Sequence, residues 1–166
     1  SRGAVPARAP RGRKGKPGKG APEPAPAGAY EESKAQDALY NAGVFREGLR
    51  DFRRAEADRL AWRATWPDAK EASRIFLSLA DLYAKEKAHA KELKQLEEYQ
   101  KRHVKDPTEW LVIQQRIAKV MERAGNAAGA RRAYEQGLQY YRAKKGQVSE
   151  RGLAVVAWAM VLALEP

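Results

Sequence analysis

The stretch that decides the fold is AGNAAGARRAYEQGL, residues 124–138. Gly125 marks a turn, and it is followed by a small residue at Ala130, an aromatic residue at Tyr134 and a second small residue at Gly137. Glycine is a strong turn signal, and small residues at helical spacing let two helices approach closely. The stretch therefore predicts a turn followed by a helix whose narrow face packs on a neighbouring helix.

A helical pattern of the same kind extends over residues 30–166. Apolar residues recur at steps of three and four, Gly and Pro fall between the periodic segments, and the two-residue alternation of a strand is missing. Asp106 before Pro107, and Asp68 with Glu71, predict two capped helix starts. We therefore predict an all-α fold with helices at about 30–47, 51–64, 68–86, 89–104, 107–124, 127–144 and 149–164.

Three such units follow one another along the chain. Small residues at Gly43, Ala80 and Ala118 recur at intervals of 37 and 38 residues, and Ala55 follows Gly43 after 12 residues. In this pattern the chain resembles the tetratricopeptide repeat, a helix hairpin with a period of about 34 residues. The middle unit departs from the family, because Glu92 stands where a small residue is expected.

The resemblance implies a right-handed α-solenoid of about three and a half hairpins, with repeats at about 36–69, 73–106 and 111–145 and a half repeat at 149–166. An ordinary helical bundle or another helix-hairpin solenoid remains the alternative. Bulky residues at helical spacing form the predicted core: Phe52, Ile75, Leu79, Tyr83, Leu93, Leu96, Ile117, Met121, Tyr134 and Leu138. Residues 153–164 are apolar on every side of the last helix, so we expect further repeats of a longer chain, or another subunit, to cover it.

Residues 1–29 have a different composition. They contain six of the nine prolines and carry more than half of the net charge of +11. Such a segment cannot bury enough apolar surface to offset its ordering entropy, so we predict a disordered basic linker before a helical domain at 30–166. Five of its cations could bind nucleic acid or another polyanion: Arg11, Arg13, Lys14, Lys16 and Lys19.

Composition and spacing argue against catalysis. The chain has no cysteine, which excludes disulfides and thiolate chemistry, and it has only two histidines, 14 residues apart, which argues against a His-rich metal site. We find no phosphate-binding glycine loop and no nucleophile with a base, so we predict no enzyme activity, no cofactor and no metal. The longest apolar run has 12 residues, whereas a membrane span needs about 20.

The remaining function is binding. The resemblance implies a concave groove that binds a partner protein through the first helices of successive units, at Tyr40, Val44, Glu47, Arg74, Leu77, Asp81, Lys85, Gln115, Arg116, Lys119 and Arg123. Arg116, Lys119 and Arg123 share one helical face and form a basic stripe that could bind an acidic peptide segment. A solvated charged face is the alternative.

Composition also bears on the setting of the protein. Frequent Ala, Arg, Gly and Pro indicate a GC-rich bacterial genome, and the loosely spaced units resemble large tetratricopeptide proteins in the cell envelope of gliding myxobacteria. The resemblance implies a non-catalytic scaffold within a multiprotein complex, and it favours the periplasm over the cytoplasm. Nucleic-acid binding through the basic segment is the second hypothesis.

Overall fold

The computed structural model of the protein describes residues 27–164. This part of the chain contains no strand and forms seven α-helices and one 3₁₀ turn, which confirms the predicted all-α class. The helices are α1 (Ala27–Gly48), α2 (Phe52–Thr65), α3 (Ala72–Lys85), α4 (His89–His103), α5 (Pro107–Arg123), α6 (Ala127–Lys144) and α7 (Glu150–Leu164), and the 3₁₀ turn η1 is Lys145–Gln147.

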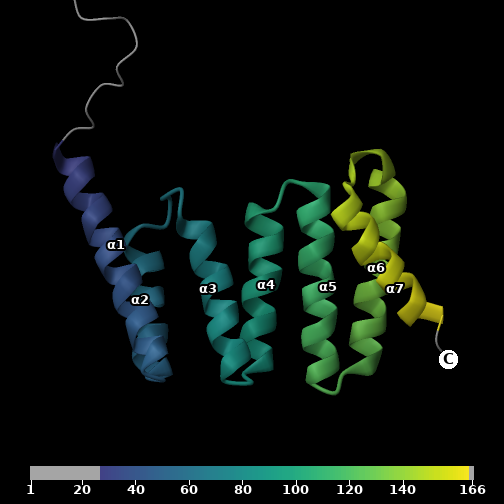
Figure 1. The fold of residues 1–166 in the computed structure, drawn as a ribbon, viewed down its shortest axis with the longest axis horizontal. Coiled ribbons are helices and arrows are strands. Elements are labelled where there is room, and N and C mark those ends of the chain that lie inside the picture. The colour runs from purple at the N-terminus through teal and green to yellow at the C-terminus, as the bar shows by residue number, and fades with distance from the viewer. Residues whose placement is uncertain (1–26, 165–166) are drawn as a thin grey trace, which may run out of the picture.

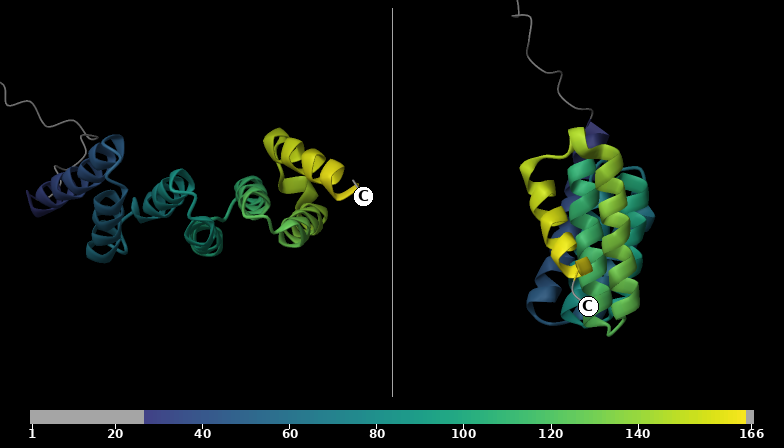
Figure 2. Two further views of the ribbon diagram at one scale, coloured as in Figure 1. Left: turned by 90° about the horizontal axis from the view of Figure 1, so that it is seen from below. Right: turned by 90° about the vertical axis from the view of Figure 1, so that its right-hand side faces the viewer.

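Helices α1 to α6 stand side by side in the order of the chain, and α7 lies across the last pair (Figure 1). Each helix packs on the next one, and α7 packs on both α5 and α6. Seen along the helices the row zigzags, so that the odd-numbered helices lie on one side and the even-numbered ones on the other (Figure 2). Side chains from α1, α3 and α5 therefore share one face of the molecule.

Small residues let the helices of each hairpin approach closely. Ala55, Ala80, Ala118 and Ala130 are buried, as the sequence pattern predicts. A Cβ atom added to Gly43 would lie 3.5 Å from the Cβ of Asp58, which is an ordinary van der Waals contact. The space between α1 and α2 at this position is therefore about that of a methyl group. These positions set the close helix spacing inside the hairpins.

The predicted core residues fall into two groups. Six are buried in the core: Ile75, Leu79, Tyr83, Leu96, Ile117 and Tyr134. The other four are half-buried: Phe52, Leu93, Met121 and Leu138. The core itself is divided, since one cluster centres on Trp62 and Ile75 between α2 and α3 and a second runs from Phe76 to Ala159.

The two predicted capped starts have different outcomes. Asp106 caps α5 as predicted, because its carboxylate accepts a hydrogen bond from the backbone N–H of Glu109 at 2.8 Å. The capping box at Asp68 and Glu71 is wrong: α3 begins at Ala72, and the side chain of Glu71 makes no cap bond. Residues 67–71 form turns instead, and the helix begins where its buried face begins.

The first helix starts earlier than predicted. It begins at Ala27, so the last three residues of the predicted linker belong to α1. Alanine is the best helix former, and Ala27 and Ala29 follow the last proline of the basic segment at Pro26. The rest of the predicted linker, with all five proposed polyanion-binding residues, lies outside the described residues.

Over residues 150–159, helix α7 buries the side that faces the preceding hairpin and exposes the other. Gly152, Val156 and Ala159 are buried against the preceding hairpin, whereas Leu153 is 43% exposed. The backbone N–H of Ser149 donates to the Thr108 hydroxyl at 2.9 Å and so ties the start of α7 to α5. Further repeats or another subunit over the outer side remain a prediction. Within the described range, no helix is long and apolar enough to cross a membrane.

Candidate functional site

A shallow groove between α1 and α3 brings together five of the predicted groove residues. Tyr40, Val44 and Glu47 line it from α1, and Asp81 and Lys85 line it from α3. The Val44 side chain is 46% exposed, which leaves an apolar contact surface open to solvent.

The groove continues along α1 toward the start of α3. Tyr40 also lines this second part, together with Asp37 and Arg74. The guanidinium carbon of Arg74 lies 5.3 Å from the centre of the Tyr40 ring, within the range of a cation–π contact. Leu77, a further predicted groove residue, is half-buried and packs against the core.

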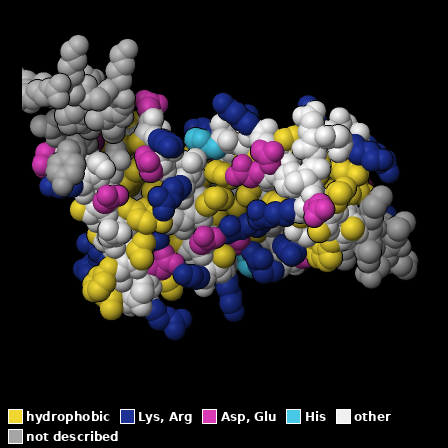
Figure 3. Space-filling model, turned by 45° about the horizontal axis from the view of Figure 1, so that its top comes forward, with side chains coloured by type: hydrophobic (Ala, Val, Ile, Leu, Met, Phe, Trp, Pro, Cys, Tyr) yellow, Lys and Arg dark blue, Asp and Glu magenta, His cyan; other side chains and the backbone are white. Residues whose placement is uncertain are grey.

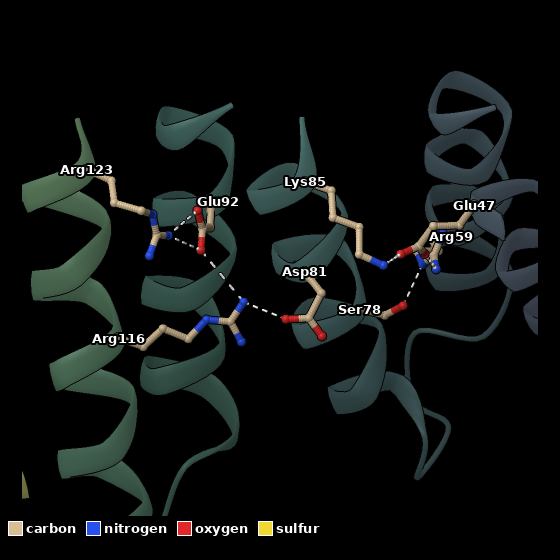
Figure 4. Close-up of polar contacts among 8 residues, drawn as sticks. All are labelled: Glu47, Arg59, Ser78, Asp81, Lys85, Glu92, Arg116 and Arg123. Carbon is tan, nitrogen blue, oxygen red and sulfur yellow. Dashed lines mark hydrogen bonds and ion pairs between the residues drawn. The ribbon is translucent and has the colours of Figure 1, made fainter. Parts of the chain in front are cut away.

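A buried arginine forms the floor of the groove. Arg59 is only 3% exposed, and its guanidinium donates to Glu47, to the Ser78 hydroxyl at 2.5 Å and to the Ala55 carbonyl at 3.3 Å. Lys85 donates to the second oxygen of Glu47 (Figure 4). A buried charge is costly without partners, and Arg59 of α2 finds its partners on its own helix and on α1 and α3. One cation therefore links these three helices.

A buried glutamate forms the centre of a second ion cluster. Glu92 of α4 is 1% exposed and accepts hydrogen bonds from Arg123 at 2.8 and 2.9 Å. The guanidinium of Arg116 lies 3.7 Å from Glu92 and 2.6 Å from Asp81 of α3 (Figure 4). The cluster therefore joins α3, α4 and α5.

These contacts change the interpretation of the basic stripe on α5. Arg116 and Arg123 are paired with carboxylates of the same chain, and the amine of Lys119 lies 4.6 Å from the centre of the Trp158 ring on α7. The stripe is thus neither an uncompensated cationic patch nor a simply solvated face. Gln115 lies beside it and lines a mainly apolar pocket beneath α7.

Acidic, basic and hydrophobic side chains are intermixed over the face seen in Figure 3. Two residues that were not among the predicted site residues, Arg59 and Glu92, are the buried centres of this pattern. Glu92 had a signal in the sequence, because it stands at a position where the resemblance to the tetratricopeptide pattern predicts a small residue. Arg59 lies one helical turn after Ala55, and nothing in the repeat pattern marks it.

Three buried tyrosines are hydrogen-bonded to glutamates. Tyr83 donates to Glu56 at 2.7 Å, Tyr99 to Glu109 at 2.5 Å and Tyr134 to Glu122 at 3.0 Å. Burial and the neighbouring carboxylate raise the pKa of each phenol, that of Tyr99 to about 12. These hydroxyls therefore stay protonated at neutral pH and act as hydrogen-bond donors.

Glu56 has the opposite shift. Burial favours a higher pKa for this carboxyl, but the hydrogen bonds from Tyr83 and Lys91 outweigh that effect and lower the pKa. Glu56 is thus stabilised in its charged form, and in that form it links α2 to Tyr83 of α3 and to Lys91 of α4.

The histidines lie apart from the groove. The ring of His103 is 5.1 Å from that of Phe76 and 5.9 Å from that of Tyr99, so it packs among aromatic residues at the end of α4. Over residues 27–164, His, Asp and Glu side chains do not gather in threes at a place that could hold a metal ion.

Comparison with known proteins places the chain in no family. No family model matches the sequence, and a search of curated proteins returns no match. The geometry of the groove and its two ion clusters therefore carries the functional argument.

Proposed function

We propose that the protein is a non-catalytic interaction module: a right-handed α-solenoid of about three and a half tetratricopeptide-like hairpins that binds a segment of a partner protein in the groove between α1 and α3. The observation that carries this proposal is the convergence of five predicted groove residues from two helices. The buried small residues of the hairpins and the two-sided row of helices support the repeat assignment.

The groove has the features of a peptide-binding surface. Val44 and Tyr40 offer apolar area, and charged groups border them at Glu47, Asp81 and Lys85. Hydrophobic contacts supply affinity in such sites, while charged groups fix the register of the bound segment. A protein that binds a partner segment in this groove and catalyses no reaction on it would act as a scaffold.

The proposal is tested by affinity capture from an extract of the source cells, with the full chain as bait. The variant Val44→Arg places a charge in the groove, and Leu60→Arg serves as the matched control, since Leu60 is a 38% exposed aliphatic residue of α2 outside the groove lining. Both variants must keep the thermal unfolding midpoint of the natural chain.

A partner protein retained by the natural chain and by Leu60→Arg, and lost by Val44→Arg, supports the groove. Equal retention by all three chains contradicts it. If the captured material is nucleic acid that all three chains release at high salt, the basic segment before α1 is the binding element instead.

A further inference from the structure

The ion pair between Asp81 and Arg116 differs from the other contacts of its cluster. The side chain of Asp81 is 59% exposed, and it meets Arg116 through one oxygen and one nitrogen at 2.6 Å. Glu92, by contrast, is buried and holds Arg123 through both of its oxygens. Exposed ion pairs contribute little to stability, so Asp81 can leave Arg116 at low cost, while Glu92 stays in place.

Both arginines keep unused donors. Each forms its ion pairs through a single terminal nitrogen, Nη2, and within residues 27–164 their other guanidinium N–H groups have no hydrogen-bond partner. A guanidinium has five N–H donors and binds a carboxylate best through two parallel bonds. Arg116 and Arg123 can therefore accept a further anion without giving up Glu92.

Lys119 adds a third cation on the same face of α5. It lies between the two arginines in sequence, its side chain is exposed, and within the described chain its amine contacts the Trp158 ring and no carboxylate. The three residues span seven positions, about 10 Å along the helix. Release of Asp81 would leave this face with two arginines and a lysine against the single charge of Glu92.

We propose that Asp81 is a built-in occupant of an anion site, and that an acidic segment of a partner protein displaces it from Arg116. This inference rests on the proposed function and names the chemistry that its binding face accepts. Glu92 is the positioning residue that holds both arginines toward the site. Asp81 lowers the affinity for acidic segments, because a ligand must first compete with it.

A peptide fits this site better than a nucleic acid. The group that occupies the site in the free chain is a single carboxylate, the same group that Asp and Glu side chains present.

The test is a titration of the full chain with octaglutamate, followed by the amide NMR shifts of α5, which report this site separately from the basic segment. Asp81→Asn removes the competitor, and Glu135→Gln is the matched control, since it removes one negative charge from an exposed ion pair with Arg131 on α6. We expect Asp81→Asn to bind octaglutamate about two- to fivefold more tightly than the natural chain. Glu135→Gln should change the affinity by less than about twofold.

The gain must depend on Arg116, so the double variant Asp81→Asn with Arg116→Gln should lose it. Equal affinities for Asp81→Asn and Glu135→Gln, or shifts that spare α5, overturn the anion site while leaving the capture result for Val44→Arg to decide the proposed function. A gain for octathymidylate as large as that for octaglutamate overturns the choice of an acidic peptide as partner.

Discussion

The buried carboxylate of Glu92 joins α4 to α5, and the isosteric change Glu92→Gln measures what this charge contributes. Glu92 is 1% exposed and accepts two bonds from Arg123, and hydrogen bonds to charged groups contribute about 1.5–3 kcal/mol. The side chains of Arg123 and Arg116 are 48% and 30% exposed, so water can solvate them after the change. The cost therefore stays below the roughly 3–5 kcal/mol of breaking a fully buried pair.

We expect Glu92→Gln to lower the free energy of unfolding by about 2 kcal/mol, which lowers the midpoint by about 4–8 °C in a chain of this size. Urea unfolding followed by circular dichroism measures the loss. The control is Glu135→Gln, whose carboxylate meets Arg131 at 3.3 Å on the exposed side of α6 and should cost less than about 0.5 kcal/mol.

A double-mutant cycle of Glu92→Gln with Arg123→Gln isolates the pair, and we expect a coupling energy of about 1 kcal/mol or more. If Glu92→Gln costs no more than Glu135→Gln, the buried cluster does not hold the helices together and the reasoning is refuted.

Three further predictions concern packing, capping and pH. Gly43→Ala should be tolerated, because the added Cβ lies 3.5 Å from its nearest neighbours, whereas Gly43→Leu should cost about 1–3 kcal/mol by overpacking; equal unfolding midpoints would contradict this. Asp106→Ala should cost about 1 kcal/mol through the lost cap of α5, and Asp68→Ala, which removes no cap, should be nearly neutral in the same urea assay. The folded-state pKa of Tyr99 is raised from 10 to about 12. The stability that the protonated Tyr99 contributes is therefore fully present below pH 10 and is lost as the pH rises to 12. Unfolding midpoints should fall less over this interval in Tyr99→Phe than in the natural chain, and parallel curves would count against the bond to Glu109.

Most of the helices could be predicted because the signals for each helix lie within its own segment of the sequence. Apolar periodicity and a break at Gly or Pro are local features, so five of the seven predicted starts lie within one residue of the structure. The capping boxes show the limit of local evidence. Asp106 precedes a proline that starts a helix, whereas Asp68 follows one inside a turn that backbone hydrogen bonds close, from Ala69 to Trp66 and from Ala72 to Ala69.

The groove was predictable in part. The repeat pattern predicts groove positions at Tyr40, Val44 and Glu47 of α1, and in the structure these three residues line one groove with Asp81 and Lys85 of α3. The spacing of residues in the sequence does not show which residue each charged side chain pairs with. Arg116 meets Asp81 across 35 residues and Arg123 meets Glu92 across 31, and such pairs follow only from how the hairpins pack.

The positions of two of the buried ions explain why the charges of the groove form pairs. Arg59 lies on α2 and Glu92 on α4, and both face groove residues on odd-numbered helices, whereas a third buried charge, Asp58 of α2, pairs with Arg46 of α1 outside the groove lining. Arg59 and Glu92 each attract groove charges of the other sign: Glu47 turns to Arg59, and Arg123 turns to Glu92. In the proposed function, a partner would therefore exchange one ion pair for another, which changes the affinity little but penalises a segment of the wrong charge. The paired charges would thus act in selecting the partner, and the exposed apolar surface of the groove would supply the affinity.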